Sequence, residues 1–162
     1  MTGAASADPL PVQLAGLARV ELRDPLFVSD LHLAAGAPAT LARFIRFCGE
    51  EAATHAELAI LGDLFEYWIG DDTLDDETDA VSRQVAAALR ALSDRGVRVF
   101  VMHGNRDLLL GAGFLRATGA QLLADPAVAS IDGRELLLAH GDAWCTQDVE
   151  YMRFRATVRQ EA

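Results

Sequence analysis

The segment Leu58-Ala59-Ile60-Leu61-Gly62-Asp63 is the strongest indication of the fold of this chain. Four apolar residues run directly into a glycine and a carboxylate, a pattern typical of a buried strand that ends at a ligand-binding edge. Three further apolar runs end in polar groups in the same way. They are residues 26–29 before Asp30-Leu31-His32, residues 97–102 before Gly104-Asn105-Arg106-Asp107, and residues 136–139 before His140-Gly141-Asp142.

Helical patterns separate these runs. The spacing of apolar residues predicts helices over residues 38–51, after the acidic loop 70–77, over 108–118 and over 148–160. Asp132-Gly133 predicts a type I′ hairpin between residues 128–131 and 135–139. The predicted fold class is α/β, with mixed β-structure flanked by helices. Residues 1–20 are expected to be an irregular lead-in, and residues 21–162 a single domain.

Charge and cysteine content exclude several classes of protein. The formal net charge of -10 argues against a nucleic-acid-binding protein, which usually carries a basic surface. The chain has two cysteines, too few for a disulfide scaffold. Cys48 is expected in the core and Cys145 is expected to be a small buried residue beside the polar groups. Neither a signal peptide nor a membrane-spanning segment is predicted. Nothing in the sequence specifies an oligomeric state.

The polar groups together suit a pair of divalent metal ions. Carboxylate, imidazole and amide oxygen ligands favour ions such as Mn²⁺ over ions that prefer thiolates. Asp30 and His32 can both point past one strand end, and Asp63 on the next strand could bridge two ions. Asn105 and His140 would complete the set. A lone aspartate at a strand end is often only a turn former, but four such groups in order indicate a two-metal phosphoesterase.

The order Asp-x-His, Gly-Asp, Gly-Asn-x-Asp, His-Gly resembles that of the calcineurin-like metallophosphoesterases. The resemblance covers the chain from about residue 26 to its end, and it implies a sandwich of mixed β-sheets flanked by helices. Residues 61–72, 103–107 and 140–146 look like the branch of this family that cleaves UDP-2,3-diacylglucosamine in lipid A biosynthesis. Arg106 supports this, because general members carry histidine after the asparagine.

This resemblance also implies roles for single residues. Asp30, His32 and Asp63 would hold one Mn²⁺, and Asp63, Asn105 and His140 the other. Asn105 and Arg106 would act in catalysis, and both would contact the substrate together with Asp148 and Tyr151. Water would attack the α-phosphorus and release UMP and 2,3-diacylglucosamine 1-phosphate. The enzyme would be cytoplasmic and peripheral on the inner membrane. Arg153, Arg155 and Arg159 could lie near its anionic surface, or they could simply form a solvated helix face.

Two alternatives stay open from the sequence. The first is a phosphoesterase of the same family that acts on other nucleotides or phosphodiesters. The second is an inactive metal-binding fragment, because family members continue through a lid and a Gly-His-x-His motif that this sequence lacks. We therefore expect the chain to be the N-terminal portion of the enzyme.

Overall fold

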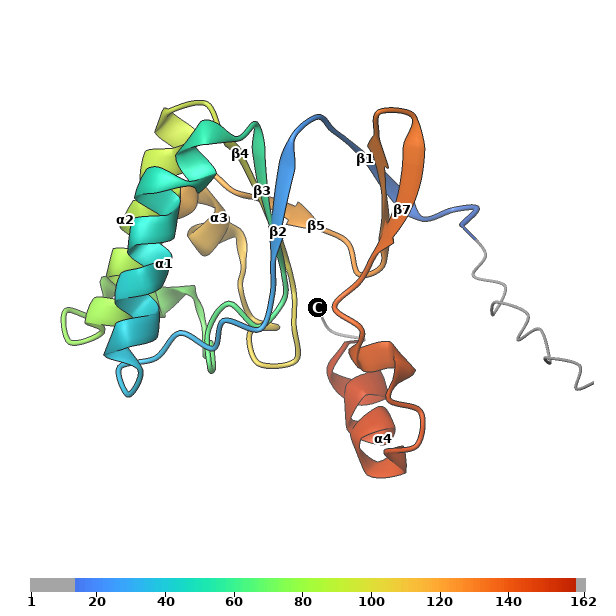
Figure 1. Cartoon of the computed structure of the whole chain (residues 1–162). Coiled ribbons are helices and arrows are strands. Elements are labelled where there is room, and N and C mark those ends of the chain that lie inside the picture. The colour runs from blue at the N-terminus through green and yellow to red at the C-terminus, as the bar shows by residue number, and fades with distance from the viewer. Residues whose placement is uncertain (1–13, 160–162) are drawn as a thin grey trace, which may run out of the picture.

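A computed structural model describes residues 14–159 and places two β-sheets face to face, with three helices on the outer face of the larger sheet (Figure 1). The fourth helix, α4, lies apart from the others, below the sheets in that view. The strands are β1 (Ala18–Leu22), β2 (Pro25–Val28), β3 (Glu57–Leu61), β4 (Arg98–Met102), β5 (Gln121–Leu123), β6 (Ala127–Ile131) and β7 (Arg134–Leu138). The helices are α1 (Pro38–Glu50), α2 (Ala80–Asp94), α3 (Ala112–Thr118) and α4 (Val149–Val158), with short 3-10 turns η1 (Ala52–Thr54), η2 (Asp71–Asp75) and η3 (Asp142–Trp144).

The larger sheet has the order β2-β3-β4-β5, and all its neighbouring strands are parallel. Alternate residues of its central strands face opposite layers, as the pleat of a strand requires. Leu58 and Ile60 of β3 pack with the helices, whereas Ala59 packs with the smaller sheet together with Phe100 of β4. Burial on both faces explains why these strands are almost continuous apolar runs.

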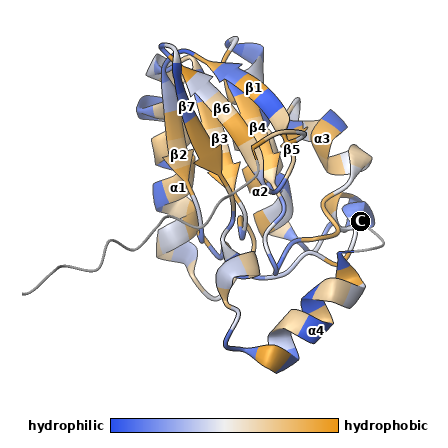
Figure 2. Cartoon of the chain, turned by 90° about the vertical axis from the view of Figure 1, so that its right-hand side faces the viewer, coloured by the Kyte–Doolittle hydropathy of each residue, from blue (hydrophilic) through white to orange (hydrophobic). Residues whose placement is uncertain are grey.

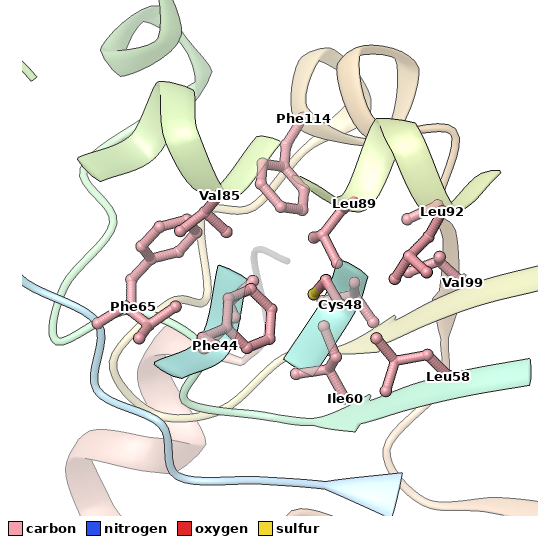
Figure 3. Packing of buried hydrophobic residues seen from close by; sticks show 14 of the residues in the cluster. Phe44, Cys48, Leu58, Ile60, Phe65, Val85, Leu89, Leu92, Val99 and Phe114 are labelled. Carbon is pink, nitrogen blue, oxygen red and sulfur yellow. The ribbon is translucent and has the colours of Figure 1, made fainter. Parts of the chain in front are cut away.

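The helix-facing core is built from side chains spaced three or four residues apart on α1 and α2 (Figure 3). Phe44 and Cys48 come from α1, and Val85, Leu89 and Leu92 come from α2. The prediction for Cys48 is confirmed, and burial raises the pKa of its thiol to about 12. Within residues 14–159, no helix combines the length and the apolar character needed to cross a bilayer.

The smaller sheet has the order β1-β6-β7 and covers the other face of the larger sheet (Figure 2). β1 runs parallel to β6, and β6 runs antiparallel to β7. The β6–β7 turn contains Asp132 with φ 49° and Gly133 with φ 75°. Two successive positive φ values are the mark of a type I′ turn, so the hairpin prediction is confirmed.

The structure corrects the prediction in three places. The single strand expected between the lead-in and residue 29 is two strands, β1 and β2, that belong to different sheets. β1 begins at Ala18, inside the expected lead-in, because it pairs with a strand that lies more than a hundred residues away. α3 begins at Ala112 instead of residue 108. Residues 1–13 of the lead-in, residue 160 at the end of the last predicted helix, and residues 161–162 lie outside the described residues.

Glu57 fixes the point where the chain passes from one sheet to the other. Its side chain is fully buried and accepts hydrogen bonds from the backbone amides of Arg23 and Asp24, each at 3.0 Å, and from Arg98 Nη2 at 2.6 Å. Burial by itself would raise the pKa of Glu57. The Arg98 guanidinium and the two amides outweigh burial and hold the pKa below its ordinary value of 4.5.

We expect Glu57→Gln to lower the free energy of unfolding by about 1.5–3 kcal/mol near neutral pH, because hydrogen bonds to a buried charge are lost. A carboxylate with a lowered folded-state pKa stabilises the fold above its ordinary pKa and loses that effect as the pH falls through the folded-state value. The difference between parent and variant should therefore shrink in acid.

Urea denaturation at neutral pH and at about pH 3 measures both effects. Glu135→Gln is the matched control, because the Arg19–Glu135 ion pair is half-exposed and should contribute at most about 1 kcal/mol. An equal loss of stability in both variants would contradict this account of Glu57.

Candidate metal centre

Polar residues that follow the strand ends of both sheets meet at one place. Asp30 lies two residues after β2, Asp63 two residues after β3, Asn105 three residues after β4, and His140 two residues after β7. Carboxyl ends of parallel strands share one edge of a sheet, which explains how β2, β3 and β4 bring three of these residues together. β7 adds the fourth from the second sheet.

The backbone is strained at the first three candidate ligands along the chain. Asp30, His32 and Asp63 have φ values of 54°, 47° and 53°, a left-handed conformation that residues other than glycine rarely adopt. Hydrogen bonds hold this geometry, from Asp30 N to Gly62 O at 3.1 Å and from His32 N to Asp63 O at 3.0 Å. Strain of this kind persists where the surroundings enforce it, and it concentrates at functional sites.

The first group of ligands fits a divalent ion. One ligand atom each from Asp30, His32 and Asp63 lies within 4.8 Å of the other two. His32 Nε2 is 3.7 Å from Asp63 Oδ2, and His32 Nδ1 is 3.0 Å from Glu66 Oε2. A carboxylate at the far nitrogen of a histidine orients the ring and leaves the other nitrogen for a metal. Glu66 was missed as a site residue, although it lies in the quoted stretch 61–72.

The second group forms on the other oxygen of Asp63. His140 Nε2 lies 3.8 Å from Asp63 Oδ1 and 3.0 Å from Asn105 Oδ1, and the His140 ring is almost fully buried. Its Nδ1 is 3.0 Å from the carbonyl oxygen of Leu61. A proton on Nδ1 would be donated to Leu61 and would leave Nε2 facing two oxygen ligands. Asp63 thus presents one oxygen to each group, which is the arrangement expected of a bridging carboxylate.

Asp107 ties the loops after β3 and β4 together. Its carboxylate is fully buried and accepts hydrogen bonds from the amides of Leu64 at 2.7 Å, Gly104 at 2.8 Å and Asp63 at 3.3 Å. Burial raises the pKa of Asp107 and the nearby Asp63 charge adds to this, whereas the amide hydrogen bonds oppose the shift. The sequence marked Asp107 as part of a polar group but gave it no role.

Gly104 allows the close approach of these two loops. A Cβ atom at this position would collide with the side chain and backbone nitrogen of Asp63. Gly49 in α1 differs, because a Cβ there would meet nothing within 4 Å. The need for glycine at position 104 therefore comes from the ligand packed against it.

Arg106 lies beside Asp63, with its side chain toward solvent. Its backbone nitrogen donates to Asp63 Oδ1 at 2.9 Å, while its half-exposed guanidinium has Nη1 3.7 Å from Glu66 Oε1. The backbone is thus fixed next to the candidate bridging ligand, and the charged group can reach an anion from outside. A guanidinium in this position suits phosphate oxygens, which it can bind in pairs.

The two candidate residues on α4 lie at the edge of the site. Asp148 caps α4 by accepting from the Tyr151 amide at 3.0 Å, and the Tyr151 hydroxyl donates to Asp142 Oδ2 at 2.6 Å. Burial and this hydrogen bond raise the pKa of Tyr151. Both residues connect to the candidate ligands through Asp142, which follows His140 by two positions.

Two expectations about nearby residues change. Cys145 is exposed, not buried. Arg155 and Arg159 pair with Asp125 and Asp142, so only Arg153 of the three arginines remains on the exposed side. The other two histidines behave as a packing residue and a peripheral one. His103 Nε2 lies 2.7 Å from Leu110 O, and His55 Nδ1 lies 3.0 Å from Asp24 Oδ2.

Comparison with curated proteins finds close relatives. The chain is 51% identical over 156 residues to a UDP-2,3-diacylglucosamine hydrolase of Ralstonia nicotianae, an alignment of 96% of the chain and 54% of that protein. Proteins of the same name from Azotobacter vinelandii and Escherichia coli O7:K1 are 48% and 49% identical over 83% of the chain. The alignments cover 54% and 55% of those two proteins, so the chain spans about half the length of these curated relatives.

The family comparison agrees with the geometry of the site. Residues 25–161 match the calcineurin-like phosphoesterase family, a range that begins at β2 and includes every candidate ligand. The chain therefore belongs to the calcineurin-like phosphoesterases.

Proposed function

We propose that this chain carries the N-terminal part of a hydrolase that cleaves the pyrophosphate bond of UDP-2,3-diacylglucosamine and yields UMP and 2,3-diacylglucosamine 1-phosphate. The proposal rests on one observation: the two carboxylate oxygens of Asp63 face two separate groups of candidate ligands. The names of the relatives support the substrate, since UDP-2,3-diacylglucosamine hydrolases are about half identical to this chain. The proposed activity would belong to lipid A biosynthesis, as the likeness to these relatives implies.

Two Mn²⁺ ions are the proposed cofactors. Asp30, His32 and Asp63 would hold one ion, and Asp63, Asn105 and His140 the other. The oxygen and imidazole donors suit manganese, and the described ligands include no thiolate. When bound, such a pair supplies Lewis acidity toward phosphoryl oxygens and activates a water for in-line attack, here at the α-phosphorus.

The chain's own residues then bind and orient the pyrophosphate. The Arg106 guanidinium stabilises negative charge on the phosphate oxygens, because it can bind two of them at once. The Asn105 amide contributes from the inner side of the site, where it is packed against His140. Asp148 and Tyr151 extend the substrate site along α4, which starts beside Asp142.

The lipid substrate makes peripheral association with the cytoplasmic face of the inner membrane part of this proposal. Trp144, Val149 and Phe154 are each 55% exposed and lie on or just before α4. Such side chains can enter the interfacial region of a bilayer. Arg153 adds an exposed positive charge on the same helix. Sedimentation with vesicles that contain anionic lipid measures this association.

Asp63→Ala should abolish UMP release from UDP-2,3-diacylglucosamine, because it removes the ligand common to both ions. Loss of metal catalysis of this kind costs several kcal/mol, and so roughly a thousandfold or more in rate. The assay uses the purified chain with Mn²⁺. Asp94→Ala is the matched control, because Asp94 is an exposed carboxylate on α2 whose partner is Arg90.

The same assay separates the two alternatives left open by the sequence. Faster cleavage of simple nitrophenyl phosphodiesters than of the UDP-lipid would favour a different phosphoesterase. Mn²⁺ binding that depends on Asp63 but gives no UMP would identify a metal-binding portion that does not turn over alone.

Arg106→Lys should reduce kcat/KM for the UDP-lipid by roughly 10- to 100-fold, because lysine keeps the charge but cannot bind two phosphate oxygens at once. Arg106→Ala should reduce it further. Mn²⁺ affinity should stay unchanged in both variants, since only the backbone of Arg106 contacts Asp63. Steady-state kinetics with calorimetry of metal binding check this, and a fall in Mn²⁺ affinity that matches the fall in rate would contradict the assigned role.

Gly104→Ala should weaken Mn²⁺ binding and lower the free energy of unfolding by about 1–3 kcal/mol, because the added methyl group forces Asp63 aside. Gly49→Ala is the control and should stabilise the chain by about 0.5–1 kcal/mol, since it replaces a glycine inside a helix without a clash. Thermal denaturation and metal titration of both variants provide the measurements. Unchanged Mn²⁺ binding in Gly104→Ala would show that the loops approach less closely than described.

A further inference from the structure

Helix α4 has an unusual attachment to the rest of the chain. None of its residues is buried, and its exposed apolar side chains include Val149 and Phe154. Figure 1 shows it below the sheets and away from the other three helices. A helix without a buried apolar face gains little from packing, so other interactions must hold it in place.

Arg155 of α4 and Arg159, which caps the C-terminus of the helix, supply those interactions. Arg159 donates from Nη2 to Asp142 Oδ2 at 3.0 Å, and its Nη1 lies 3.1 Å from Asp125 Oδ2. Arg155 places Nε 3.0 Å from Asp142 Oδ2 and Nη2 3.6 Å from Asp125 Oδ2. Both arginines therefore span the same two carboxylates.

The two carboxylates belong to the connections around His140. Asp142 follows His140 by two residues, and Asp125 lies in the link between β5 and β6. The other oxygen of Asp125 accepts from the backbone nitrogen of His140 at 3.1 Å. Arg159 also donates to the carbonyl oxygen of His103 at 3.4 Å, one residue before Gly104. Arg155 and Arg159 thus contact two carboxylates next to His140, and Arg159 also contacts His103, two residues before Asn105.

Burial makes this network energetically significant. The side chains of Asp125 and Asp142 are only 5% exposed, and those of Arg155 and Arg159 are 19% and 15% exposed. Removing the arginines would leave the two carboxylates buried without compensating charge, which would strongly destabilise this part of the chain. Burial would raise the pKa of Asp142, but the Tyr151 hydroxyl and the two guanidinium groups outweigh it and lower the pKa.

We propose that Arg155, Arg159, Asp125 and Asp142 form a clamp that fixes the backbone of His140 and holds α4, with Asp148 and Tyr151, against the metal centre. These four are positioning residues, because they act through His140 and α4. The inference rests on the proposed function for the roles of His140, Asp148 and Tyr151. The attachment itself rests on contacts in the chain alone, so it can be tested without turnover.

The test uses amide hydrogen exchange of the 162-residue chain, followed residue by residue by NMR. In the double variant Arg155→Met/Arg159→Met, we expect the amides of α4 and of His140 to exchange at least about tenfold faster, while those of β3 and β4 keep their protection. Arg153→Met is the matched control on the same helix and should change none of them.

A second pair of variants separates the clamp from a general loss of charge. Asp125→Asn keeps an oxygen that can accept from the His140 amide, but it loses the ion pairs with the arginines. It should therefore loosen α4, which still pairs with Asp142, and keep most of the protection at His140. Asp125→Ala removes both interactions, so it should expose the His140 amide and weaken Mn²⁺ binding roughly tenfold.

Three results would overturn the clamp. The first is unchanged exchange of α4 and His140 in the double variant. The second is equal protection of His140 in Asp125→Asn and Asp125→Ala. The third is a loss of protection spread evenly over β3 and β4, which would show general destabilisation. No exchange measurement depends on UMP release, so absence of turnover would count against the proposed function alone.

Discussion

The buried carboxylate of Asp107 is the interaction on which the site depends. It accepts amides from both the β3 loop and the β4 loop, and these loops carry Asp63 and Asn105. A buried carboxylate without partners would be costly, so the two loops remain close enough to satisfy it. That closeness excludes any side chain at Gly104 and turns Asp63 toward both ligand groups.

Parallel pairing of β2 with β3 fixes Asp30 and His32 relative to Asp63. Hydrogen bonds continue past the strand ends, from Asp30 to Gly62 and from His32 to Asp63, and they hold both residues at positive φ. The energetic cost of this backbone is met by a core buried on both faces of the larger sheet. The helices on one face and the smaller sheet on the other therefore stabilise the strand ends that carry the candidate ligands.

The second sheet contributes His140 to the same edge, and hydrogen bonds rather than strand pairing hold this residue there. His140 follows β7, an edge strand, and its position is set by contacts of its ring with Leu61 and Asn105 and of its backbone with Asp125. Arg155 and Arg159, at the C-terminal end of α4, pair with Asp125 and Asp142 and complete this support. His140 and α4 are thus the parts of the site that depend most on charge and least on apolar packing.

Most helices and strands and all the candidate ligands could be predicted from the sequence, because local patterns encode both. Apolar runs of strand length predicted β3 and β4 closely, and an Asp-Gly pair was sufficient for the β6–β7 hairpin. Tertiary structure alone decided that β1 and β2 separate into two sheets, that Glu66 lies beside His32, and that Arg155 and Arg159 turn inward. These features depend on strand pairing between distant segments and on the pairing of charged side chains in the folded chain. No local pattern in the sequence encodes either.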